Sequence, residues 1–150
     1  EYLAPEIIQS KGHGKAVDWW ALGILIYEML VGYPPFFDDS PFKIYEKILQ
    51  GKVEFPRFMD SAAKDLIRRL LTTDKMKRIG NLKNGADDVK RMKWFKGVDW
   101  NELQQKMIPS PIVLKVAYDG DTRYFEKYPD QQLPVANALS DEQQKLFADF

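Results

Sequence analysis

Two carboxylates stand inside the most apolar stretch of this 150-residue chain, residues 16–31 (AVDWWALGILIYEMLV). A carboxylate removed from water needs a cation or hydrogen-bond donors beside it. Asp18 lies two residues inside the start of the stretch, where it could cap a helix. Glu28 lies near the end, where the plainest partner is a cation that closes an ion pair. These two carboxylates therefore indicate a site that binds positively charged groups.

Composition excludes several other kinds of site. Cysteine is absent and His13 is the single histidine, so neither a disulfide nor a zinc site with thiolate ligands is available, and we expect no metal site. The lack of cysteine fits a reducing cytosol. The 22 basic and 22 acidic residues cancel, which disfavours nucleic acid and acidic membranes as partners. A secretory signal is lacking, and a start at Glu1 without Met suggests a fragment.

Three helices are expected in the first half of the chain. Residues 16–31 are apolar almost all round and predict a buried helix that is too short to span a membrane. Ser40 followed by Pro41 predicts the start of a second helix over 41–50, which ends at Gly51. Ser61 is expected to cap a third helix that ends near Thr73. Its buried face would carry Leu66, Ile67, Leu70 and Leu71.

Shorter elements follow. Residues 78–85 are typical of turns, and Asp87 with Asp88 favours the first turn of a short helix. Asp99 and Glu102 have the spacing of a capping box. With 45% hydrophobic residues the chain can bury one core, so we predict one mainly α domain over residues 1–106.

Residues 107–150 are expected to form an extended tail. Prolines punctuate this segment, and its aromatic side chains need a surface to dock on. Near its end, Ser140 and Gln143 can form a capping box before the apolar residues Leu146, Phe147 and Phe150.

Four spaced motifs resemble those of protein kinases. They are Leu3-Ala4-Pro5-Glu6, residues 18–23 (DWWALG), residues 32–36 (GYPPF) and Arg78. The strings KAVDWWALGILIYEML and RIGNLKNGADDVK narrow the resemblance to the AGC group, and within it to the catalytic subunits of cAMP-dependent protein kinases, including the X-linked form. The expected fold is the helical C-lobe portion of the kinase fold with an extended C-terminal tail.

The resemblance implies roles for the charged residues. Glu6 and Arg78 would form a buried ion pair, where the alternative is two surface charges. Asp18 would accept hydrogen bonds from the backbone of the catalytic loop. Glu1 and Glu28 would face substrate arginines.

The resemblance also implies roles for apolar and aromatic residues. Leu3 would line the pocket for the residue after the phosphoacceptor, and Tyr2 would orient Glu28. Tyr45 would dock the regulatory subunit, where the alternative is the edge of the core. Phe125 and Tyr128 would contact adenine, and Phe147 and Phe150 would insert into the amino-terminal lobe.

The parent protein would then transfer the γ-phosphoryl group of ATP, with Mg²⁺, to Ser or Thr in Arg-preceded substrates. Its expected partners are basic protein substrates, a cAMP-binding regulatory subunit, pseudosubstrate inhibitors and the kinase N-lobe. Its expected location is the cytoplasm, with the nucleus as an additional location. The strand Lys, H-R-D and D-F-G motifs are not in this sequence, so the chain alone is expected to be inactive. Two other interpretations stay open, a pseudokinase scaffold and a helical module that docks a regulatory subunit.

Overall fold

The computed structural model describes residues 1–129 and 139–149, in two units. One unit is Glu1–Ile108 and the other begins at Pro109. The buried hydrophobic side chains of the described residues all lie in the first unit, so this unit contains the core.

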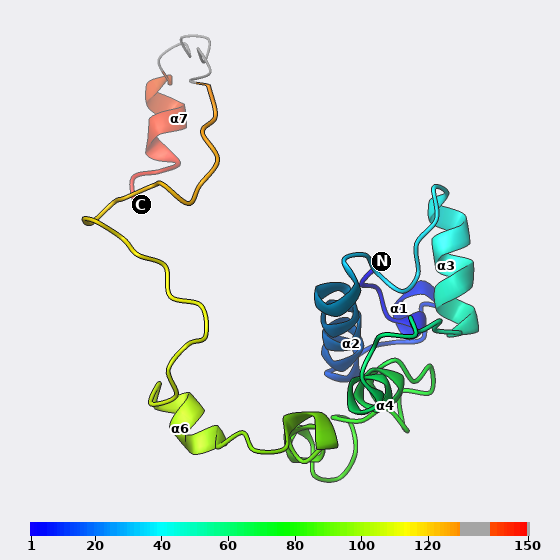
Figure 1. The fold of residues 1–150 in the computed structure, drawn as a ribbon. Helices are drawn as coiled ribbons and strands as arrows, with labels where there is room; N and C mark the ends of the chain where they lie inside the picture. The colour runs from blue at the N-terminus through cyan, green and yellow to red at the C-terminus, as the bar shows by residue number, and fades with distance from the viewer. Residues whose placement is uncertain (130–138, 150) are drawn as a thin grey trace. The chain divides into compact units, whose positions relative to one another are not determined.

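Helices account for the regular structure. In chain order they are α1 (Pro5–Ile8), α2 (Ala16–Val31), α3 (Pro41–Gln50), α4 (Ser61–Leu70), α5 (Ala86–Lys90), the 3₁₀ helix η1 (Lys93–Phe95), α6 (Trp100–Gln104) and α7 (Asp141–Lys145) (Figure 1). No strand occurs in the described parts of the chain, which confirms the prediction of a mainly α fold. In the same parts, no helix is both long and apolar enough for a bilayer crossing.

The core forms where α2 packs against α4. Trp20 and Ile24 of α2 are fully buried, as are Leu66, Ile67 and Leu70 of α4, so the predicted apolar face of α4 is confirmed. Gly23 permits the close approach, because a Cβ atom there would lie 2.8 Å from Cδ2 of Leu71. Phe36, from the loop after α2, stacks on Trp20 with ring centroids 5.8 Å apart. α1 lies beside α3 (Figure 1).

Two of the predicted helix caps are wrong. α4 is capped by Asp60, whose carboxylate accepts hydrogen bonds from the backbone N–H groups of Ala62 and Ala63, and Ser61 is the first helical residue. The helix also ends at Leu70, before Thr73. α2 is preceded by Lys15, and Asp18 is exposed with no capping hydrogen bond among the described residues.

Other helix ends follow the prediction more closely. α3 spans Pro41–Gln50 and ends at Gly51, which adopts the left-handed conformation at φ +65°. Ser40 occupies the N-cap position there, but its side chain makes no capping hydrogen bond within the described residues. Asp99 caps α6 by accepting hydrogen bonds from the backbone N–H groups of Asn101 and Glu102, but the Glu102 side chain makes no return bond within the described residues, so only half of that predicted capping box forms. Ser140 with Gln143 forms the predicted capping box of α7.

Candidate functional site

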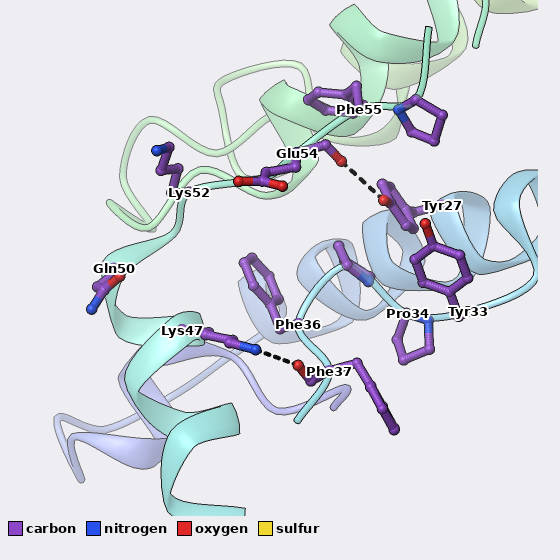
Figure 2. Close-up of a pocket in the computed structure, with 12 residues that line it drawn as sticks. Tyr27, Tyr33, Pro34, Phe36, Phe37, Lys47, Gln50, Lys52, Glu54 and Phe55 are labelled. Atoms are coloured by element: carbon purple, nitrogen blue, oxygen red, sulfur yellow. Dashed lines mark hydrogen bonds between the residues drawn. The ribbon is translucent and has the colours of Figure 1, made fainter. Parts of the chain in front are cut away.

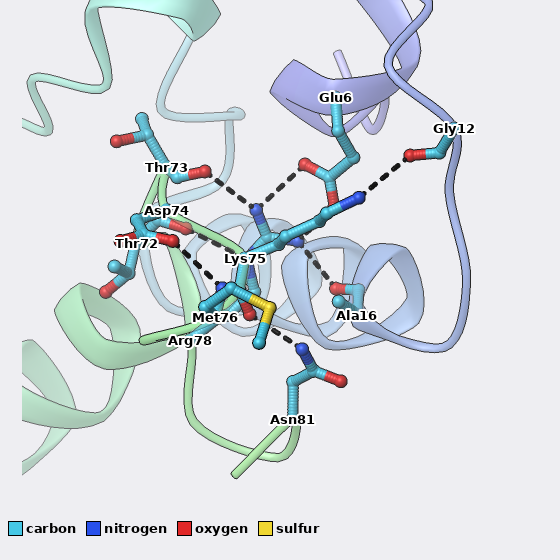
Figure 3. A network of polar contacts seen from close by, with 10 residues as sticks. All are labelled: Glu6, Gly12, Ala16, Thr72, Thr73, Asp74, Lys75, Met76, Arg78 and Asn81. Carbon is cyan, nitrogen blue, oxygen red and sulfur yellow. Dashed lines mark hydrogen bonds and ion pairs between the residues drawn. The ribbon is translucent and has the colours of Figure 1, made fainter.

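Glu6 and Arg78 form a buried ion pair. Arg78 Nη1 lies 2.8 Å from Glu6 Oε1 and Nη2 lies 2.9 Å from Oε2, a bidentate arrangement (Figure 3). Arg78 is 0% exposed and Glu6 is 5% exposed. The pair connects α1 with the turn after α4 and fixes the end of the A-P-E motif against the core.

Arg78 also donates hydrogen bonds to backbone carbonyl oxygens. Nη1 donates to the carbonyl oxygen of Ala16 at 2.7 Å, and Nε donates to that of Thr72 at 2.9 Å. The guanidinium lies over the Trp20 ring, 5.1 Å from its centroid. Burial would raise the pKa of Glu6, but the hydrogen bonds and charge of Arg78 outweigh it, so the pKa lies below its ordinary value. Glu6 is therefore a carboxylate at neutral pH.

Glu28 receives a hydrogen bond from the hydroxyl group of Tyr2. This bond, with the nearby negative charge, raises the pKa of Tyr2 above its ordinary value. Glu28 is half-buried near the end of α2, and no Lys or Arg pairs with it within the described residues. Its carboxylate is thus oriented by a neutral donor and keeps acceptor capacity for a cation.

Glu1 and Leu3 lie in the segment that carries Tyr2. Glu1 is exposed and Leu3 is 41% exposed, whereas Ala4 next to them is fully buried. The segment before α1 therefore presents one carboxylate, one tyrosine and one apolar side chain on the surface. Their substrate roles stay predictions, as does the contact of Asp18 with a catalytic loop.

An aromatic cavity of about 750 Å³ lies beyond the end of α2, and sequence reasoning missed it. Tyr27, Tyr33 and Phe55 line it, and the ring centroids of Tyr27 and Phe55 are 6.1 Å apart (Figure 2). The Tyr27 hydroxyl donates to the carbonyl oxygen of Glu54 at 2.9 Å. The available signal was the density of aromatic residues and prolines from Tyr27 to Pro56.

The other predicted site residues that the structure describes are at least partly exposed within their own units. Tyr45, on α3, is 38% exposed. In the second unit Phe125 is 74% exposed and Tyr128 is 79% exposed, and the Tyr128 hydroxyl donates to Glu126. Phe147 is 58% exposed, and Phe150 lies outside the described residues. The proposed contacts of Phe125 and Tyr128 with adenine and of Phe147 and Phe150 with the amino-terminal lobe stay predictions. The docking role of Tyr45 also stays a prediction.

Acidic residues and His13 do not gather into a metal site in the parts of the chain that the structure describes. The ligands that Mg²⁺ prefers are carboxylate and carbonyl oxygens, and a kinase holds the ion with the D-F-G Asp and an Asn of the catalytic loop. The residues present here do not fit that role.

Comparison with known proteins shows the family of this chain. The family model described as protein kinase domain matches residues 1–95. The chain is 60% identical over 150 residues to cAMP-dependent protein kinase catalytic subunit 3 of Drosophila melanogaster, covering all of this chain and 26% of the relative.

Two further relatives have similar names. The chain is 57% identical over 150 residues to cAMP-dependent protein kinase catalytic subunit PRKX of Homo sapiens, covering 42% of it, and 54% identical over 153 residues to the Dictyostelium discoideum catalytic subunit, covering 24%. All of this chain is covered in both matches, so it spans about a quarter to two-fifths of the length of these relatives. The resemblance predicted from the sequence is confirmed, and the chain belongs to the protein kinase domain family.

Proposed function

We propose that the full-length protein containing this chain is a Ser/Thr protein kinase that transfers the γ-phosphoryl group of ATP to substrates with an arginine before the phosphoacceptor. The observation that carries the proposal is the hydrogen bond from Tyr2 to Glu28, which orients a carboxylate that no Lys or Arg of the described residues neutralises. A guanidinium donates two parallel N–H groups to such a carboxylate. The relatives, named as cAMP-dependent kinase catalytic subunits, support the assignment.

The residues of this chain would contribute binding and orientation rather than phosphoryl transfer itself. Glu28 and Glu1 would attract the arginine side chains, Leu3 would contact the apolar residue after the phosphoacceptor, and the Glu6–Arg78 pair would fix this segment to the core. ATP supplies the phosphoryl group and Mg²⁺ neutralises the charge that develops on it. We assign the binding of Mg²⁺ and of the ATP phosphates to residues outside this chain, and aromatic contacts with adenine to Phe125 and Tyr128.

Glu28→Gln tests this proposal in the full-length protein. The substitution keeps the shape and removes the charge, so a peptide with Arg two residues before the phosphoacceptor should lose roughly 1.5–3 kcal/mol of transition-state stabilisation. That is roughly ten- to a hundredfold in kcat/KM. A matched peptide with Ala at that position should react at an unchanged rate, because it never made the contact.

Two results would reject parts of the proposal. An equal fall for both peptides would make Glu28 a structural residue. A full-length protein that consumes no ATP with either peptide would favour the pseudokinase scaffold.

We also propose that Tyr45 belongs to a docking surface for a cAMP-binding regulatory subunit. Its side chain is partly exposed on α3, and the apolar Phe42, three residues earlier, is 83% exposed. Residues three apart on a helix share one face. Tyr45→Ala should weaken inhibition by the regulatory subunit and leave short-peptide kinetics unchanged, whereas equal loss of peptide turnover would assign Tyr45 to core packing.

A further inference from the structure

A second cavity, of about 420 Å³, lies between the loop that joins α1 to α2 and the turn that follows α4. It is lined by residues 11–16, with the sequence KGHGKA, and by Lys75, Met76 and Asn81. None of these residues belongs to the Tyr2 and Glu28 surface or to the aromatic cavity.

The charged residues that line this cavity are all basic. Lys11, Lys15 and Lys75 line it together with His13, and its lining contains no Asp or Glu. The chain as a whole has equal numbers of acidic and basic residues, so the concentration of ammonium groups is local. A concave surface lined by one sign of charge focuses its field and attracts ligands of the opposite sign.

Hydrogen bonds hold the cavity in place before any ligand binds. Lys75 Nζ donates to the carbonyl oxygen of Gly12 at 3.1 Å, which joins the two walls and leaves two further N–H donors on the ammonium group (Figure 3). The side-chain amide of Asn81 donates to the carbonyl oxygen of Lys75 at 2.7 Å. The backbone N–H of Lys11 donates to the carbonyl oxygen of Glu6 at 3.0 Å. Hydrogen bonds therefore fix both the loop and the turn that contain the lysine residues of the cavity.

The rim of the cavity leaves space for a polypeptide. Gly12, at φ +69°, and Gly14 have no atom within 4 Å of the position where a Cβ would stand, so another backbone can come close to the loop. Met76, which is 71% exposed, provides an apolar side chain at the edge. A free anion would use only the ammonium groups, whereas a peptide would also contact the glycines and Met76.

We propose that this cavity binds the phosphoryl group of a phosphoserine or phosphothreonine in a partner protein. A phosphoryl group carries nearly two negative charges at pH 7 and three acceptor oxygens, and lysine ammonium groups bind it as point charges. Lys11, Lys15 and Lys75 supply the positive charge, and the glycine loop receives the backbone that flanks the phosphorylated residue.

Fluorescence anisotropy with the full-length protein tests the assignment. The probe is a labelled peptide of Ala, Gly and Ser with a single phosphoserine, compared at physiological ionic strength with its unphosphorylated form and with a form carrying Glu in its place. Saturable binding of the phosphopeptide alone, with competition by inorganic phosphate, is the expected result. The double substitution Lys11→Ala and Lys15→Ala should weaken it by about tenfold or more, since two charge-assisted contacts are lost.

The matched control is Lys83→Ala with Lys96→Ala, which removes the same charge from exposed positions outside the cavity. This control should change the affinity by less than about twofold, because screening weakens distant surface charges. If both double variants weaken phosphopeptide binding equally, the loss comes from net charge alone, and the proposed site is overturned. Equal binding of the Glu peptide, or no saturable binding, would also overturn it. Capture by phosphatidic acid vesicles without peptide binding would assign the cavity to a membrane surface instead.

Discussion

The guanidinium of Arg78 and the carboxylate of Glu6 make two parallel hydrogen bonds, at 2.8 and 2.9 Å, across 72 positions of sequence. Both side chains are removed from water, and Arg78 also donates to the carbonyl oxygens of Ala16 and Thr72. One side chain thereby connects α1, the start of α2 and the turn after α4.

Arg78→Met should lower the free energy of unfolding by about 3–5 kcal/mol, because Glu6 then stays buried without its cation. The matched control is Arg69→Met, which removes an exposed ion pair with Asp65 in α4. That control should cost less than about 1 kcal/mol. Denaturant unfolding of the full-length variants measures both values. Similar losses of unfolding free energy in the two variants would show that the buried Glu6–Arg78 pair stabilises the fold no more than the exposed pair does.

Stability should also fall in acid through Glu6. The folded-state pKa of Glu6 is lowered, since the Arg78 hydrogen bonds and charge outweigh the opposing effect of burial. The contribution is therefore complete above the unfolded pKa of about 4.3 and is lost as the pH falls through the lower folded value. Below about pH 4.3, wild type should lose stability more steeply than Glu6→Gln in denaturant midpoints. Parallel curves would contradict this assignment.

The sequence predicts this pair better than it predicts local helix ends. The A-P-E motif and Arg78 have family spacing, so the resemblance could place them together although 72 positions separate them. At the start of α4, Asp60 and Ser61 are adjacent and both suit an N-cap. Which of them caps depends on how the loop before α4 packs, and composition does not record that.

A local turn and tertiary contacts explain the other differences. Asp18 has the type and position of a capping residue, but the chain already turns at Gly14 and Lys15, where the N–H of Val17 donates to the carbonyl oxygen of Gly14. The stacking of Phe36 on Trp20 and the aromatic cavity depend on a loop returning over α2. Hydrophobic periodicity shows which face of a single helix is apolar, and it does not show which loop packs over that helix.

Gly23→Ala tests the packing of α2 against α4. Alanine favours a helix over glycine by about 1 kcal/mol, which alone would stabilise α2. Its Cβ would lie 2.8 Å from Leu71 Cδ2 and 2.9 Å from Leu70 Cβ, so overpacking should dominate with a net loss of roughly 1–3 kcal/mol. Gly14→Ala is the control, because its Cβ would meet open space and its stability should be equal or higher. A more stable Gly23→Ala protein would mean that α4 can move away at little cost.

Tyr2→Phe in the full-length protein tests whether orientation of Glu28 matters for substrate selection. The substitution removes the hydroxyl donor and keeps the ring, so Glu28 keeps its charge but loses its fixed position. The expected result is a fall of roughly three- to tenfold in kcat/KM for the peptide with Arg two residues before the phosphoacceptor, mainly through KM. The matched Ala peptide should react at the wild-type rate.

Coupling between the two residues separates orientation from an independent effect of Tyr2. If Tyr2 acts through Glu28, the double variant Tyr2→Phe with Glu28→Gln should be no slower than Glu28→Gln alone, since the contact served by the hydroxyl is already lost. Additive losses would contradict this relation. An alkaline titration followed by tyrosine absorbance gives a second readout without substrate. Glu28→Gln should return the raised pKa of Tyr2 toward about 10, whereas Glu1→Gln should lower it less, because Glu28 both accepts the hydrogen bond and contributes the larger charge effect.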